Sequence, residues 1–222
     1  MLSDLKKGIG VSILAILTMA TGGCFKNLPS KNIIYDNNFE NGDTSYIRVS
    51  NVNGPVDSLK VVTVNGSKVL GRFNNHLVIL TLKNLPEHNA LKFEFDLNIH
   101  DNWNGEHLLP GNSVPDVWIM KVDGYPVYIT TFSNGPYNQS FPDNYKNGTS
   151  KNPPRSNAWE VLPGACAAAS QSNGTTRYKI EYTTAHTGNM ELSLSDALQP
   201  FNSMCQKSWS VDNLRITAVK YN

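Results

Sequence analysis

The sequence from residue 91 to residue 99 is Leu-Lys-Phe-Glu-Phe-Asp-Leu-Asn-Ile. Every second residue is apolar, and a charged or amide residue stands between each pair of apolar residues. Side chains of a β-strand point alternately to opposite faces, so this pattern predicts a strand with one face in a core and one polar face.

Similar segments recur along the chain, and two dipeptides join some of them into hairpins. Asn65-Gly66 separates residues 61–64 from the segment after Ser67, and Asp123-Gly124 separates residues 117–122 from residues 125–132. Both dipeptides favour the two-residue turns that connect antiparallel strands. Further strands are predicted over residues 77–82, 177–184, 190–194 and 209–221.

The order of the segments predicts the fold class. Short strands follow one another without intervening long helices, and only residues 165–170 are expected to form a helical turn. This arrangement predicts an all-β protein, a two-sheet antiparallel sandwich of the jelly-roll kind. Residues 134–157 are rich in Asn, Gly, Pro and Ser and have no periodicity, which predicts a long loop.

The beginning of the chain combines a charged, an apolar and a small-residue segment. Lys6 and Lys7 precede an apolar run over residues 9–20, and small residues lead to Cys24. The run is about a dozen residues long, whereas a membrane span needs roughly 20. The segment resembles a bacterial lipoprotein signal, which implies removal of residues 1–23 and attachment of a lipid to Cys24.

That resemblance also implies a domain organisation and a location. Residues 24–32 are expected to be a tether, and residues 33–222 a single β-sandwich domain of ordinary size. Phe25 stands where some lipoproteins have the aspartate that retains them in the inner membrane. The resemblance therefore implies a lipid anchor in the bacterial cell envelope, at the outer membrane.

Charge and cysteine content restrict the possible partners. The formal net charge is +1 and 17% of the residues are charged, so the chain has no strong field that would attract nucleic acid. Besides Cys24, the chain contains Cys166 and Cys205, an even pair that predicts a disulfide in an exported protein. The alternative is a reactive or metal-binding thiol pair, although no histidine lies beside either cysteine at zinc-ligand spacing.

The densest group of polar residues follows the strand over residues 91–99. Residues 100–106 are His-Asp-Asn-Trp-Asn-Gly-Glu. Carboxylate and amide oxygens near a glycine suit Ca²⁺, and the candidate ligands are Asp101, Asn104 and Glu106. A hydrogen-bonded loop without metal and a catalytic loop are the alternatives.

Several motifs resemble one recurring domain of exported bacterial proteins. They are Leu85-Pro86-Glu87-His88, Phe95-Asp96-Leu97, the segment 101–106, Pro115-Asp116-Val117-Trp118, Val122-Asp123-Gly124 and the segment 207–216. The resemblance implies a concanavalin A-like or galactose-binding-like jelly-roll domain. Asn102 and Asn104 depart from the serine and aspartate of the pattern, and the second change lowers the negative charge of the loop.

The two ends of the domain resemble a second type of cation site. Residues 35–40 and 211–213 are similar to jelly-roll carbohydrate-binding and adhesion modules in which the first and last strands pair and share a structural Ca²⁺. The resemblance implies that Glu40 and Asp212 are its side-chain ligands. The alternative is a pair of carboxylates that only contact water.

A catalytic role is the alternative to binding. Glu94-Phe95-Asp96 is similar to the Glu-x-Asp-x-x-Glu strand of laminarinase-like glucanases, but the third carboxylate position is Ile99. No serine-hydrolase elbow or zinc-protease helix motif is present. No catalytic residue is therefore assigned.

Aromatic residues near the polar loops are the candidate ligand-binding residues. They are Trp103, Trp118, Trp159 and Tyr137. Such rings stack on sugars when they are exposed and fill a core when they are buried. The leading hypothesis is a carbohydrate-binding or cell-surface-binding lipoprotein with structural Ca²⁺. A protein-docking adhesion or structural lipoprotein is the second hypothesis, and a glycoside-active enzyme is the third.

Overall fold

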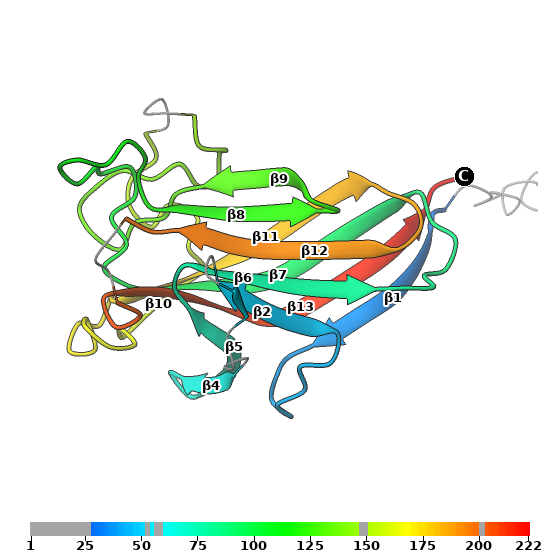
Figure 1. Ribbon diagram of the computed structural model, residues 1–222, viewed down its shortest axis with the longest axis horizontal. Helices are drawn as coiled ribbons and strands as arrows, with labels where there is room; N and C mark the ends of the chain where they lie inside the picture. Colours follow the sequence, from blue (N-terminus) through cyan, green and yellow to red (C-terminus); the bar gives the residue numbers. More distant parts are fainter. Residues whose placement is uncertain (1–27, 52–53, 56–59, 147–150, 200–202) are drawn as a thin grey trace, which may run out of the picture.

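The computed structural model describes residues 28–51, 54–55, 60–146, 151–199 and 203–222, and these form two antiparallel β-sheets that lie one over the other (Figure 1). No helix occurs among these residues, so none could cross a membrane. The predicted all-β sandwich is therefore confirmed.

The seven-stranded sheet has the order β10 (Glu160–Leu162), β11 (Thr175–Ala185), β7 (Ala90–Asp101), β13 (Lys207–Lys220), β5 (Ser67–Phe73) and β4 (Val61–Val64), and β1 (Ser30–Asn37) pairs with β13. The six-stranded sheet has the order β3 (Gly54–Pro55), β2 (Ile47–Asn51), β6 (His76–Leu82), β12 (Met190–Ala197), β8 (Val117–Val122) and β9 (Tyr125–Thr130).

The alternating segment 91–99 forms most of β7, which pairs with β11 on one side and β13 on the other. Its apolar residues lie in the core between the sheets, and they are Leu91, Phe93, Phe95, Leu97 and Ile99. Burying each of these side chains contributes about 1.5–3 kcal/mol. The alternate side chains of β7 lie on the outer face of the seven-stranded sheet.

Both predicted hairpins are present. β4 and β5 are connected at Asn65-Gly66, and β8 and β9 are connected at Asp123-Gly124. Asn65 and Asp123 have φ values of 50°, and the glycine that follows each also has a positive φ. These are the backbone conformations that a type I′ turn requires. Residues 165–170 form turns and bends and no helix.

The first strand begins inside the expected tether. Ser30 pairs with Lys220 and Asn32 pairs with Ala218, so residues 30–32 belong to the sheet. The expected signal segment 1–23 and Cys24 lie outside the described residues.

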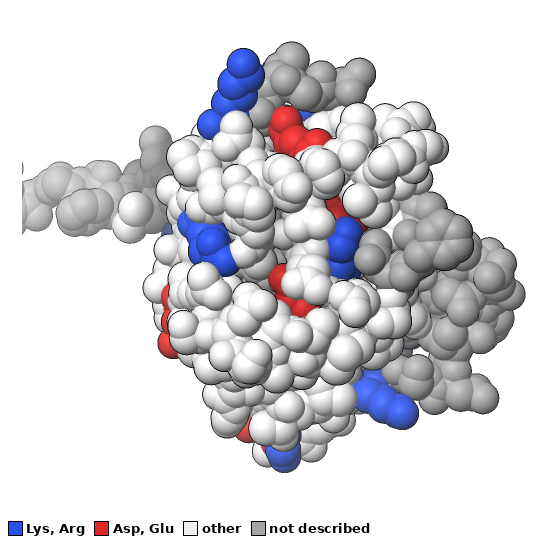
Figure 2. Space-filling model, turned by 90° about the vertical axis from the view of Figure 1, so that its left-hand side faces the viewer, with Lys and Arg blue, Asp and Glu red and all other residues white. Residues whose placement is uncertain are grey.

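The long loops gather at one end of the sandwich, on the left in Figure 1. The disulfide Cys166–Cys205 links two of them, with 5.0 Å between the Cα atoms, as the cysteine count predicted. Most of the described surface at this end is uncharged, with Lys, Arg, Asp and Glu side chains only at scattered positions (Figure 2). β1 and the C-terminus lie at the opposite end (Figure 1).

Candidate functional site

The predicted acidic loop is held by hydrogen bonds to protein groups. Asp101 is buried at the end of β7, and its Oδ1 accepts hydrogen bonds from the backbone N–H groups of Cys166 (2.9 Å) and Ala168 (3.0 Å). Glu106 accepts a hydrogen bond from the Ser140 hydroxyl at 2.7 Å. Asp101 therefore positions the disulfide-linked loop.

Asn104, the third predicted ligand of this loop, forms an isolated β-bridge with Ser133. The three predicted ligands thus have different protein neighbours. Within the described ranges, no group of three or more His, Cys, Asp or Glu side chains could hold a metal ion. Calcium binding by this loop stays a prediction.

The second predicted pair of carboxylates shares one neighbour, the Ser67 hydroxyl. The Ser67 hydroxyl lies 3.2 Å from Oε1 of Glu40 and 3.0 Å from Oδ2 of Asp212. Lys68 adds two contacts to Glu40, from its backbone N–H to Oε1 (3.0 Å) and from Nζ to the backbone carbonyl (2.7 Å). Burial raises the pKa of Asp212, and the Ser67 hydrogen bond opposes this rise.

Two of the four predicted stacking residues are core residues, which corrects the sequence-based assignment. Trp103 and Trp118 are both 0% exposed. The Trp103 indole donates a hydrogen bond to the Ser208 carbonyl at 2.8 Å, and Trp118 contacts Trp209 edge to face with 6.2 Å between ring centroids. Neither ring can reach a ligand, because Trp118 points inward from β8 and Trp103 turns inward after β7.

Tyr137 is 39% exposed in the loop-bearing end of the molecule. Its ring is stacked on His107, with 4.0 Å between the centroids and 9° between the planes. One face of this ring is therefore already covered by a protein group.

Trp159 is 46% exposed and lies directly before β10. Its backbone N–H donates to the Arg177 carbonyl at 3.1 Å, so it continues the pairing of β10 with β11. The Arg177 guanidinium carbon lies 5.3 Å and the Lys179 Nζ 4.7 Å from the ring centroid. Two cations therefore contact the ring and restrain it on the outer face of the sheet.

Arg177 is itself held on both sides. Its Nε donates to Asn98 Oδ1 at 2.7 Å, and its Nη1 donates to Glu160 Oε2 at 2.7 Å. This fixed guanidinium gives Trp159 a rigid support. Arg177 and Lys179 were not assigned to the site from the sequence. A signal was present, because the two residues are two positions apart in the predicted strand and therefore share one face.

A chain of buried polar groups lies below Arg177. Asn98 donates to the Ser210 hydroxyl at 3.2 Å, the Ser210 hydroxyl is 2.8 Å from His100 Nε2, and His100 Nδ1 is 3.1 Å from the Thr175 hydroxyl. Burial is the main cause that lowers the pKa of His100 to about 3, with smaller contributions from the charges of Arg72 and Arg177. His100 is therefore a neutral structural residue at neutral pH.

A polar groove adjoins Lys179 on the outer face of the seven-stranded sheet, and we call it the outer groove. It encloses about 240 Å³. Besides Lys179, its polar lining residues are Asp36, Glu94, Asp96, Glu181, Asn213 and Arg215.

Lys179 connects the outer groove to Trp159. Its Nζ lies 3.3 Å from Asp96 Oδ1, and Asn213 donates to Asp96 Oδ2 at 2.8 Å. Carboxylate, amide and ammonium groups therefore line a groove beside an exposed indole ring. Hydroxyl-rich ligands can use both kinds of group, because sugars present hydroxyls at their edges and C–H groups on their faces.

Glu94 and Asp96 lie on the polar face of β7, as their alternation predicted, and both line the outer groove. Ile99, at the position where glucanases of the similar pattern have a third carboxylate, is fully buried in the core. The third carboxylate of that pattern is thus missing from this strand.

No family model matches the sequence, and no curated protein matches it. The structure is similar to that of a carbohydrate-binding module, CBM51 from Clostridium perfringens GH95, in complex with methyl-galactose, at a TM-score of 0.29 and 11% sequence identity. The match covers 84% of this chain and 92% of that chain. A likeness at this TM-score carries no information about a ligand of this chain. The fold and the outer face define the chain as a β-sandwich domain with a polar groove beside an exposed tryptophan.

Proposed function

We propose that this domain binds carbohydrate on the outer face of the seven-stranded sheet, with Trp159 as the stacking surface. The observation that supports this proposal is the half-exposed Trp159 ring, held by Arg177 and Lys179 at the border of the outer groove. A rigid ring loses little conformational entropy when a sugar stacks on it, so its position favours binding.

The outer groove would supply the hydrogen bonds. Glu94, Asp96 and Glu181 accept hydrogen bonds from sugar hydroxyls, and Lys179 and Asn213 donate them. A domain that binds a ligand without catalysing a reaction needs no activated nucleophile or general acid. The function proposed is binding.

A glycan array that includes bacterial and host polysaccharides, run with and without Ca²⁺, tests the proposal. Trp159→Ala should lower the affinity for each retained glycan at least roughly tenfold, because it removes the stacking surface. The matched control is Tyr125→Ala, which removes an exposed ring from the β8–β9 hairpin of the other sheet and should leave binding unchanged.

Unchanged glycan binding by folded Trp159→Ala protein would contradict the proposed site. If no glycan is retained and an envelope protein is captured through the same face, the protein-docking hypothesis replaces carbohydrate binding.

We also propose that the domain is held at the bacterial envelope by a lipid on Cys24. The Cys166–Cys205 disulfide supports export, since disulfides persist outside the reducing cytosol. Anchoring would raise the effective concentration of a weak binding surface near the envelope. Labelled palmitate should be incorporated by the natural chain and not by Cys24→Ser, and globomycin should block processing. Processing that is insensitive to globomycin would contradict the anchor.

A further inference from the structure

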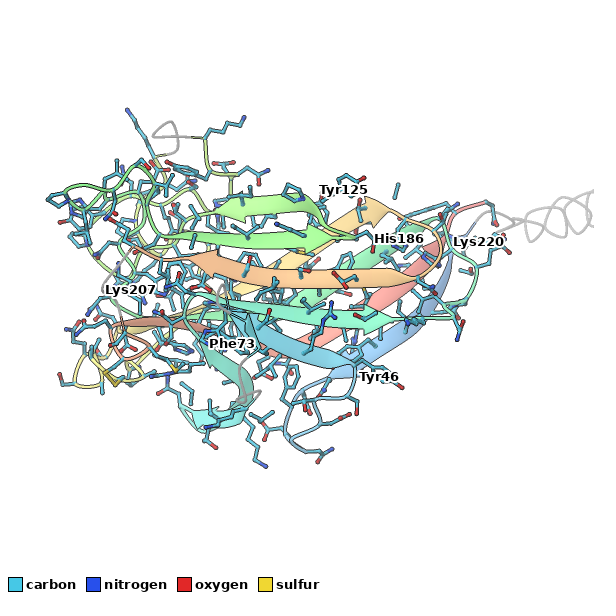
Figure 3. The ribbon with its side chains drawn as sticks, viewed as in Figure 1. Tyr46, Phe73, Tyr125, His186, Lys207 and Lys220 are labelled. Carbon is cyan, nitrogen blue, oxygen red and sulfur yellow. A yellow bond between two sulfur atoms is a disulfide. The ribbon has the colours of Figure 1, made fainter. Side chains whose placement is uncertain are left out.

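A lysine and an aspartate meet inside the loop-bearing end of the sandwich. Lys207 is the first residue of β13 in one sheet, and Asp116 directly precedes β8, a strand of the other sheet. Lys207 Nζ contacts Asp116 Oδ2, and their side chains are only 2% and 0% exposed. Figure 3 shows Lys207 at the loop-bearing end, far from the exposed Lys220 at the other end.

The pair occupies the position next to the aromatic core. Trp118 lies two residues after Asp116, Trp209 lies two residues after Lys207, and these two rings contact each other at 6.2 Å. Because alternate residues of a strand share a face, the amine and the carboxyl group point into the same interior as the two indoles.

An ion pair is costly in this environment. Moving such an ion from water to a protein interior carries a large desolvation cost, which good hydrogen bonds must offset. An ammonium group has three N–H donors. Among the residues that the structure describes, Lys207 Nζ donates to Asp116 Oδ2.

The carboxyl group of Asp116 has a second contact. Its Oδ1 accepts a hydrogen bond from the backbone N–H of Gln199 at 2.9 Å. A backbone N–H at this distance stabilises negative charge that develops on a carbonyl oxygen during attack by a nucleophile. The buried site therefore combines a nucleophile, Lys207 Nζ, with an electrophilic carbon, Asp116 Cγ, and with an oxyanion donor, the Gln199 N–H.

We propose that Lys207 and Asp116 condense to form an intramolecular isopeptide bond that links the two sheets covalently. One proton passes from Nζ to Oδ2 of the carboxylate, which gives an amine and a carboxylic acid. The nitrogen lone pair then attacks Cγ, and negative charge collects on Oδ1, where the Gln199 N–H donates.

The intermediate collapses with loss of water. A second proton passes from the nitrogen to the departing hydroxyl, the Cγ–Oδ2 bond breaks, and the Nζ–Cγ amide remains with one hydrogen on nitrogen. No oxidant or reductant is needed. Condensation is unfavourable in bulk water, but fixed intramolecular groups reach effective concentrations of about 10⁵–10⁸ M, and the product amide is neutral.

Mass spectrometry of the purified natural chain, after reduction and alkylation of the disulfide, tests this proposal. The intact mass should be lower than that of the unlinked chain by one water molecule. Trypsin should yield a branched peptide that joins residues 93–121 to residues 180–215, because the modified Lys207 is not cleaved.

Two variants give the controls. Lys207→Met should show the full mass calculated for its own sequence, without loss of water, and should release residues 93–121 as a linear peptide. Lys220→Met removes an exposed lysine that pairs with Glu87, and it should retain the branched peptide. Cleavage of the natural chain after Lys207, with an intact mass equal to that of the unlinked chain, would overturn the proposal; this measurement does not depend on whether a variant folds.

Discussion

The ammonium nitrogen of Lys179 lies 4.7 Å from the centroid of the Trp159 ring and 3.3 Å from Oδ1 of Asp96. One side chain of β11 thus connects the exposed indole with a carboxylate of β7 in the outer groove. This contact defines the face on which binding is proposed.

Replacing Lys179 should weaken carbohydrate binding more than it weakens folding. In Lys179→Met the ring loses one cation contact, worth about 0.5–1 kcal/mol at an exposed site, and Asp96 loses the ammonium group beside its Oδ1. We expect a several-fold increase in the Kd of each glycan retained by the natural chain. Urea unfolding should change by less than about 1 kcal/mol. Lys83→Met, at an exposed position after β6, is the control. An equal increase in Kd in both variants would show that Lys179 does not belong to the binding face.

Trp118→Ala should lower the stability of the fold, whereas Trp159→Ala should lower the affinity for glycans. Trp118 is fully buried against Trp209 and Phe132, so its removal leaves a large cavity. The expected loss is about 3–5 kcal/mol of the free energy of unfolding, measured with urea or guanidinium. A variant that remains as stable as the natural chain would show that the ring does not contribute to the core.

Removing the disulfide should destabilise the loop-bearing end. Cys166 and Cys205 are 39 residues apart, and closing a loop of this size contributes up to about 4 kcal/mol in the chain-entropy model. The Cys166→Ser/Cys205→Ser variant should unfold at lower urea concentration than the natural chain. Limited proteolysis should cut the loop over residues 163–174 first. Equal protection of this loop in both chains would mean that Asp101 holds it without the disulfide.

His100 should make the protein less stable in mild acid. Its pKa is about 3 in the fold because the ring is buried, whereas the unfolded chain binds the proton near pH 6.5. The unfolded state therefore binds more protons between these two values, and stability falls as the pH drops below about 6.5, by at most about 1.4 kcal/mol per pH unit. Urea unfolding at a series of pH values should show this slope, and His100→Asn should reduce it. The same slope in both proteins would assign the acid sensitivity to carboxylates.

Calcium binding at Glu40 and Asp212 predicts a melting temperature that rises in millimolar Ca²⁺ and falls in EGTA. Glu40→Gln and Asp212→Asn should abolish the difference, because they remove the carboxylates on both sides of Ser67. Glu106→Gln serves as a comparison, since it alters only the loop after β7. Loss of the difference in Glu106→Gln alone would assign the metal to that loop, and equal melting temperatures of the natural chain in both solutions would contradict both predicted sites.

The strand over residues 91–99 and the two hairpins could be predicted because their signals are local. Alternation follows from the geometry of one strand, and the Asn-Gly and Asp-Gly turns depend on the φ preferences of the residues in the turn. The pairing of Cys166 with Cys205 was predicted by assigning Cys24 to the lipid anchor, which leaves these two of the three cysteines.

The roles of the tryptophans were decided by the tertiary structure. Trp103, Trp118 and Trp159 all stand near polar loops in the sequence, but only Trp159 emerges on the outer face. Trp103 follows β7 and Trp159 precedes β10, so strand alternation does not say whether either ring points into the core. The packing of the segments around each ring decided its exposure.

The sequence by itself therefore determined the strands, their polar and apolar faces, the sandwich class and the cysteine pair, because each depends on backbone geometry or on counting. Only the tertiary structure brought Lys179 to Trp159 and Lys207 to Asp116, which are 91 residues apart. The first contact forms where β10 pairs with β11 on the outer face of one sheet. The second forms where the two sheets close over their shared core. Both depend on segments that are separate in the chain.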